Sequence, residues 1–149
     1  MLKLYERLVA AISSSSPESL MLLFVRVVFA GIFWRSGQAK MAEGSWLTIS
    51  DGTWELFRTE YSGVPLPPEL AASLAAGAEH LFPVLLVAGL FTRLSALALL
   101  VMTMTIQIFV FPDAWWTEHS LWAALALVLI VRGGGIVAID KLLTRRREA

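Results

Sequence analysis

The sequence contains no cysteine and only two histidines, His80 and His119. The lack of cysteine excludes disulfides, thiolate metal sites and iron–sulfur ligation on this chain. The two histidines differ in depth by roughly half a membrane at about 1.5 Å per helical residue, so we expect no haem held between them. No phosphate loop, dinucleotide fingerprint or nucleophile elbow occurs either. We therefore expect no metal, no haem and no self-contained enzyme.

Charge is also scarce, at 16% of the residues against 57% hydrophobic residues, and the formal net charge is zero. A neutral chain offers no electrostatic footprint for nucleic acid, so we expect no such partner. The mean hydropathy of +0.69 lies well outside the range of soluble domains. The composition predicts a membrane protein that forms one domain over residues 1–149.

Four apolar runs are long enough to cross a hydrocarbon core about 30 Å thick. They cover approximately residues 17–38, 68–90, 94–111 and 120–139. Proline followed by an acid opens the first and second runs, which is typical of a helix start. The triplet Gly133-Gly134-Gly135 could instead end the fourth helix early. The predicted fold is an all-α membrane protein with a bundle of four transmembrane helices.

The segment between the first two spans, residues 40–67, is too polar to cross a membrane but is rich in aromatic residues. Ser50 can cap a short helix on which Trp54, Phe57 and Tyr61 share one side. We predict an amphipathic helix in the outer membrane interface, and a folded loop over the bundle is the alternative.

The basic residues predict the topology. One side of the membrane would hold Lys3, Arg7, Arg93, Lys141 and residues 145–147, and the other Lys40 and Arg58, with Arg35 near its border. The positive-inside rule then places both termini in the cytoplasm of a bacterial inner-membrane protein. All six tryptophans fall on the outer side, where they would anchor the protein in the interface or dock a lipid-like or protein partner. Self-association into a homo-oligomer stays open.

Polar residues at membrane depth are costly and point to function. Counted at about 1.5 Å per residue, Arg26, Glu79, Gln107 and Arg132 fall within about two helical turns in depth. They predict a polar site inside the bundle, with Arg26 as the expected partner of Glu79. Surplus positive charge suits a carbonyl oxygen such as that of a quinone head group.

Pro83 cannot donate to the Glu79 carbonyl, which predicts a bend and a free backbone acceptor beside the carboxylate. His80 follows Glu79 at about 100° around the helix, so it is either a packed helix residue or a proton relay with Glu79. The predicted catalytic residues are thus Glu79 and His80. The predicted carrier-binding residues are Arg26, Lys40, Gln107 and Arg132.

Several motifs resemble those of the DoxX family of small bacterial membrane proteins. They are an arginine in the first span followed by residues 35–40 (RSGQAK), Glu79 opening the second span, the turn at residues 89–94 (GLFTRL), and the closing glycine triplet with Asp140. The closing motif departs from the family pattern, in which proline stands at the position of Gly134. The resemblance implies a four-helix inner-membrane protein. Some relatives are subunits of quinone-linked sulfur oxidation, and others are tied to oxidative or thiol stress.

Two hypotheses follow. The first is an accessory subunit of a membrane oxidoreductase that binds quinone, with Glu79 and His80 handling protons. The second is a non-catalytic membrane partner or small transporter in metal or stress homeostasis, which engages proteins through its outer aromatic loops.

Overall fold

The computed structural model describes residues 6 and 15–145, which form helices joined by short turns. The elements are α2 (Ser15–Ala39), α3 (Asp51–Thr59), α4 (Pro68–Ala88), α5 (Thr92–Phe109), the 3₁₀ turn η1 (Pro112–Ala114), the π-helical turn η2 (Trp115–His119), α6 (Ser120–Arg132) and α7 (Ile139–Arg145). In the described part of the chain, strand-like pairing is limited to one bridge between Met41 and Ile49. The predicted all-α class is confirmed.

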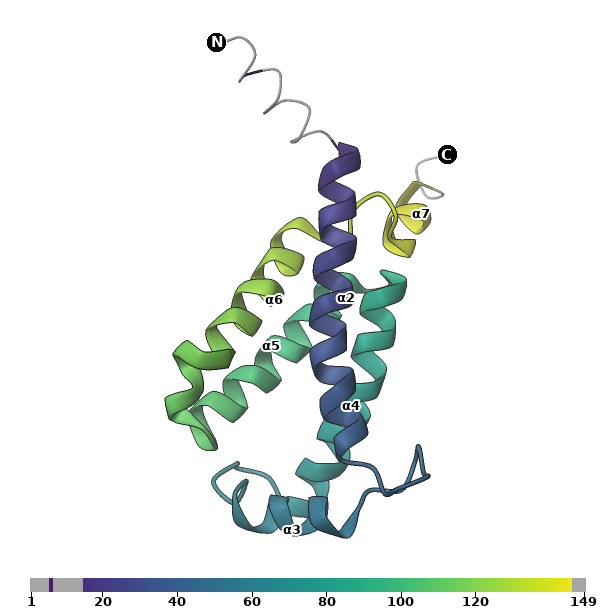
Figure 1. Ribbon diagram of the computed structural model, residues 1–149. Helices are drawn as coiled ribbons and strands as arrows, with labels where there is room; N and C mark the ends of the chain where they lie inside the picture. Colours follow the sequence, from purple (N-terminus) through teal and green to yellow (C-terminus); the bar gives the residue numbers. More distant parts are fainter. Residues whose placement is uncertain (1–5, 7–14, 146–149) are drawn as a thin grey trace.

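Four helical segments are long and apolar enough to cross a membrane: α2, α4, α5 and the combined stretch Pro112–Arg132. In the bundle α2 packs mainly against α4, and α5 against α6 (Figure 1). Many apolar side chains on the outer faces of these helices are exposed, among them Phe24 at 68% and Val131 at 67%. Apolar exposure on this scale fits a lipid environment. The chain is a multi-pass membrane protein.

The core runs along the centre of the bundle. Its buried members include Leu22, Phe29, Phe33, Leu86, Leu99 and Leu129. The rings of Phe29 and Phe33 meet edge to face, with 5.3 Å between centroids, and Phe33 also contacts Trp122 of α6. These aromatic contacts join α2 to α6.

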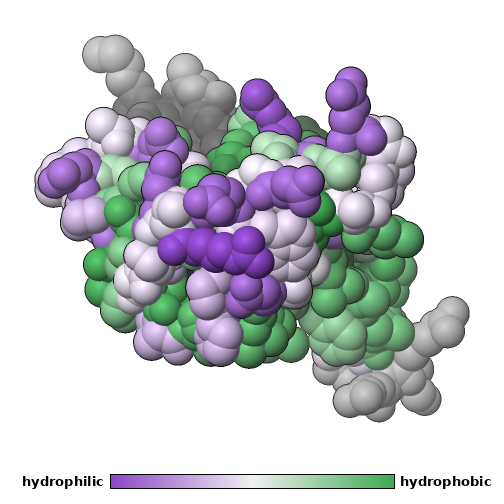
Figure 2. Space-filling model, turned by 90° about the horizontal axis from the view of Figure 1, so that it is seen from below, coloured by the Kyte–Doolittle hydropathy of each residue, from purple (hydrophilic) through white to green (hydrophobic). Residues whose placement is uncertain are grey.

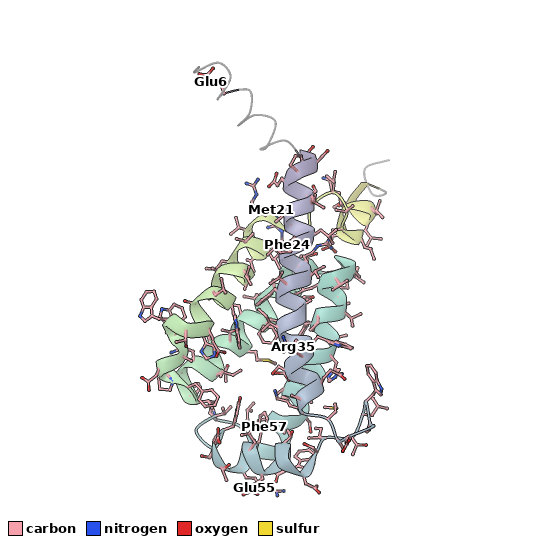
Figure 3. The ribbon with its side chains drawn as sticks, viewed as in Figure 1. Glu6, Met21, Phe24, Arg35, Glu55 and Phe57 are labelled. Atoms are coloured by element: carbon pink, nitrogen blue, oxygen red, sulfur yellow. The ribbon has the colours of Figure 1, made fainter. Side chains whose placement is uncertain are left out.

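The predicted amphipathic helix is α3, which lies across one end of the bundle (Figure 1). The Ser50 hydroxyl accepts the N–H of Thr53, as the sequence predicts for the cap. Phe57 is buried against Ala71 and Ala72 of α4, whereas Glu55 lies on the opposite side of the helix (Figure 3). We call this end of the bundle the α3 end. Seen from below, its face gathers hydrophilic residues, as expected for an end that meets water (Figure 2).

The start of α2 and the short helix α7 lie at the opposite end of the bundle, which we call the α7 end (Figure 1). The prediction of the fourth span was wrong here, because α6 ends at Arg132 rather than near residue 139. Gly133 has a φ of 77° and a ψ of −162°, a backbone conformation that only glycine adopts readily. The start of this span also differs from the prediction. Residues Trp115–His119 were predicted as a loop, but they form a helical turn that leads into α6.

The tight turn between α4 and α5 depends on Gly89 and Asp140. Gly89 ends α4 with a φ of 70°. The Asp140 carboxylate accepts the N–H groups of Phe91 and Thr92, at 2.7 and 2.8 Å, and so caps the start of α5. The Asp140 N–H in turn donates to the Gly89 carbonyl at 2.9 Å. This reciprocal bonding holds α7 to the turn.

Replacing Gly89 by alanine should lower the free energy of unfolding by about 2 kcal/mol or more. A Cβ at this position would meet the Arg26 guanidinium and lie 2.7 Å from Ala138 Cα, in a left-handed backbone. Thermal unfolding of the purified protein in detergent measures the loss. Gly77→Ala is the control, because its Cβ would enter open space within α4. It should raise stability by up to about 1 kcal/mol, so equal effects of the two changes would contradict the account.

Candidate functional site

A buried ion pair joins α4 to the end of α2. The Lys40 ammonium donates to Glu79 Oε1 at 2.9 Å and lies 2.8 Å from Oε2. Glu79 is 1% exposed and Lys40 9%. Oε2 accepts no aligned hydrogen bond from the described residues, so it is the carboxylate atom with unused acceptor capacity.

Ser36 completes the site from α2. Its hydroxyl donates to Glu79 Oε1 at 3.0 Å and accepts from the Lys40 ammonium at 3.1 Å. Ser36 and Lys40 are four residues apart, so both reach the same face of the helix. The three side chains form a closed polar triangle at the α3 end of the bundle.

The chain after α2 fixes the position of Lys40. Its carbonyl accepts the Ser50 N–H and the Thr53 hydroxyl, each at 3.0 Å, so the cap of α3 also holds the residue before the loop. Gly37 lets α2 and α4 approach, because a Cβ there would lie 3.0 Å from Glu79 Cβ and 2.9 Å from His80 Cε1. Backbone placement therefore brings the ammonium to the carboxylate.

His80 lies beside this site with both ring nitrogens hydrogen-bonded. Nδ1 donates to the Ala76 carbonyl at 2.7 Å, and Nε2 accepts from the Gln38 side-chain amide at 2.9 Å. Because a carbonyl can only accept, Nδ1 carries the proton and the ring is neutral in this arrangement. Trp34 packs edge-on against the ring, with centroids 5.3 Å apart. The proton-handling role of His80 stays a prediction.

Two cavities reach Glu79. The larger, of about 280 Å³, lies between the α3 segment, α4 and α5, and its lining is mostly aliphatic, with Lys40, Glu79 and Tyr61 as the main polar groups. The smaller, of about 120 Å³, lies towards α2, η2 and α6 and includes Ser36 and His119. We call them the apolar cavity and the polar cavity. Glu79, Tyr61 and Ile106 line both and form the wall between them.

Tyr61 faces the cavities from the loop after α3. Burial raises the pKa of its phenol, and the negative charges of Glu79 and Glu60 raise it further. The phenol therefore stays protonated and remains a hydrogen-bond donor at physiological pH. Its ring stacks on Phe57, with centroids 4.5 Å apart, which fixes its direction.

Gln107 is not bonded to Glu79. Its amide nitrogen donates to the Pro112 carbonyl at 2.6 Å, and its amide oxygen lies 2.7 Å from His119 Nδ1. His119 is 2% exposed. Gln107 thus orients the second histidine rather than the carboxylate.

Arg26 was expected to pair with Glu79, and that expectation was wrong. It lies towards the α7 end, where Nη1 donates to the carbonyls of Leu86 and Val87 at 3.4 Å. These carbonyls belong to the last turn of α4, about 10 Å along the helix from Glu79. The Arg26 Nε and Nη2 atoms have no hydrogen-bond partner among the described residues.

Arg132 also lies apart from Glu79. It forms an ion pair with Glu18, in which Nε donates to Oε1 at 2.7 Å, and its side chain is 57% exposed. The depth estimate for Arg132 was wrong because α6 ends at this residue. Of the predicted site residues, the structure brings Glu79, Lys40 and, beside them, His80 together, and leaves Arg26 and Arg132 at the α7 end.

Sequence reasoning did not identify Ser36 and His119 as site residues. The sequence did contain a signal for Ser36, because it stands four residues before Lys40 and so lies on the same face of the first span. His119 offered no such signal, because its neighbours predicted a loop.

Comparisons with known proteins give one family match and one relative. A family model described as DoxX matches residues 21–113. A protein of Haemophilus influenzae described as "Uncharacterized protein" is 29% identical over 140 residues, which covers 83% of each chain. No solved structure matches the chain.

Replacing Lys40 by methionine should lower the free energy of unfolding by about 3–5 kcal/mol, because it leaves the buried Glu79 charge without its cation. The double variant Lys40→Met, Glu79→Gln should recover most of that loss, since neither charge is then buried. Titration of the folded protein with sodium dodecyl sulfate in mixed micelles measures both values. A double variant no more stable than Lys40→Met would show that the pair is not coupled.

Proposed function

The chain belongs to the DoxX family, and from the site described above we propose that it is a membrane subunit that binds a quinone in a quinone-linked redox system. The protein would lie in the bacterial inner membrane with both termini in the cytoplasm, which puts the α3 end on the outer side. It would act as an accessory subunit of an oxidoreductase.

The observation that supports this proposal most is the composition and placement of the apolar cavity. Its lining includes Leu66, Leu74 and Val101, which are also exposed on the outer surface at 45%, 54% and 58%. The cavity is therefore reached past side chains that face lipid. A ligand that partitions into the bilayer can enter by this route.

The polar groups suit a carbonyl-bearing ring. The Lys40 ammonium and the Tyr61 phenol are donors at the inner wall, and Glu79 is an acceptor beside them. At about 280 Å³ the cavity is slightly smaller than the usual range for ligand sites, roughly 300–1,000 Å³, which suits one ring-sized head group. A few placed polar groups in an apolar lining are typical of such sites.

In this proposal each polar residue of the site has its own role. Lys40 and Tyr61 would hold carbonyl oxygens, and Glu79 Oε2 would accept or supply a proton at the ring. A bound quinone supplies the redox chemistry, which the side chains of this chain do not offer. Ser36 keeps the carboxylate oriented by occupying Oε1.

Equilibrium dialysis of a short-chain ubiquinone against the purified protein in lipid nanodiscs tests the proposal. Lys40→Met should weaken binding by about tenfold or more, because a charged hydrogen bond to the ring is lost. Met102→Trp should abolish binding by filling the cavity that Met102 lines. Arg132→Gln is the matched control at the α7 end and should leave binding unchanged.

Failure of the unmodified protein to bind quinone would overturn the proposal. So would unchanged quinone reduction by the parent complex after Glu79→Gln.

Exposed aromatic residues at the α3 end favour a second candidate, a non-catalytic membrane partner. Trp46 is 66% exposed and Trp116 is 86% exposed. Replacing both by alanine should release a specific protein partner in mild-detergent purification while quinone binding persists. Deletion of residues 46–61 is a poorer test, because Phe57 packs into the bundle. Loss of quinone binding without change in co-purified protein would exclude this candidate.

A further inference from the structure

The polar cavity contains a histidine that sequence reasoning set aside. His119 lies in η2, at the connection between α5 and α6, which is at the same end of the bundle as α3 (Figure 1). It lines the polar cavity together with Ser36, Tyr61 and Glu79. An imidazole and a buried carboxylate thus border one small space.

The hydrogen bonds of His119 fix its tautomer. The Pro112 carbonyl can only accept, so the amide nitrogen of Gln107 faces it and the amide oxygen faces the histidine. Nδ1 must then carry the proton that it donates to this oxygen. The neutral ring therefore has its lone pair on Nε2, which takes part in no hydrogen bond with the described residues.

His80 and His119 differ in how many of their ring nitrogens are hydrogen-bonded. Nε2 of His80 already accepts from Gln38, and Nδ1 donates to a backbone carbonyl, so neither nitrogen can exchange a proton without breaking a hydrogen bond. His119 has one nitrogen fixed and one available. The ring is also held by Trp122, whose centroid lies 5.0 Å away. His119 lines the polar cavity, and its Nε2 is free to accept a proton. These two features favour His119 over His80 as the proton carrier.

We propose that His119 transfers protons between the water at the α3 end and Glu79 through the polar cavity. Nε2 takes up a proton to give the imidazolium, which passes one proton across the cavity to Glu79 and returns to the neutral ring. No electron moves in this step, and one proton is carried in each cycle. This inference rests on the proposed function, in which the ligand approaches the same carboxylate from the apolar cavity.

The charged and titratable groups around the polar cavity fit this direction of transfer. Glu118, on the same turn as His119, is exposed and lines the cavity, so it offers a carboxylate towards water. Tyr61 contributes a neutral phenol, and the ammonium of Lys40, which directly follows α2, is bonded to the Glu79 carboxylate.

Infrared difference spectroscopy tests the step without any quinone. The C=O band of protonated Glu79, identified by its absence in Glu79→Gln, is followed in the purified protein after a rapid fall in pH. His119→Gln should slow the rise of this band by about a hundredfold, the lower end of the range for loss of a positioned acid or base. The final amplitude at equilibrium should stay the same, because only the route is removed.

Arg132→Gln at the α7 end is the control and should leave the rate unchanged. His80→Gln tests the alternative carrier next to Glu79 in the chain, and it should slow the rate less than His119→Gln does. In His119→Ala, added imidazole should restore the rate, which a purely structural role would not allow. An unchanged rate in His119→Gln, or slowing in His80→Gln alone, would overturn the proposal. So would a slowed His119→Ala variant that imidazole does not rescue.

The outcome is independent of ligand binding. Protonation of Glu79 through His119 with no quinone bound by dialysis would reject the proposed function and retain the proton route. The reverse result would retain quinone binding and reject the route. Thermal unfolding of each variant confirms that the rates compare folded proteins.

Discussion

The ion pair between Lys40 and Glu79 is the interaction on which the α3 end of this protein depends. A carboxylate that is 1% exposed inside a membrane bundle is stable as an anion only when its charge is compensated at short range. The compensation requires α2 and α4 to approach at Gly37, and it requires the chain after α2 to turn back so that Ser50 and Thr53 hold the Lys40 carbonyl. The loop, the cap of α3 and the walls of both cavities follow from that placement.

At the α7 end, polar side chains bind the termini of α4 and α5. Arg26 closes the last turn of α4 by donating to its carbonyls, and Asp140 caps the first turn of α5 by accepting its N–H groups. The opposite charges therefore lie at opposite helix termini, where each complements the local dipole. Gly89 provides the space for this arrangement. The polar residues of the spans thus serve two separate centres, one that fixes a turn and one that lines cavities.

The sequence predicted the features that depend on local pattern. Three spans lie within a few residues of their predicted bounds, and the cap at Ser50 and the buried side of α3 are as expected. It could not predict the partner of Glu79, because the Lys40 side chain starts just beyond the end of α2 and reaches back along that helix. It also misjudged Arg132, since depth counting needs the helix end, and three successive glycines leave that end undecided.

Glu79 borders two cavities of different character, and this separation has a physical reason in a bilayer. A lipid-soluble ring needs an apolar opening, whereas a proton needs a chain of polar groups or water, and one passage cannot provide both without exposing the buried charge to lipid. The wall of Tyr61, Ile106 and Glu79 itself divides the two routes. Because the carboxylate is part of that wall, it can meet a ligand on one side and a proton donor on the other.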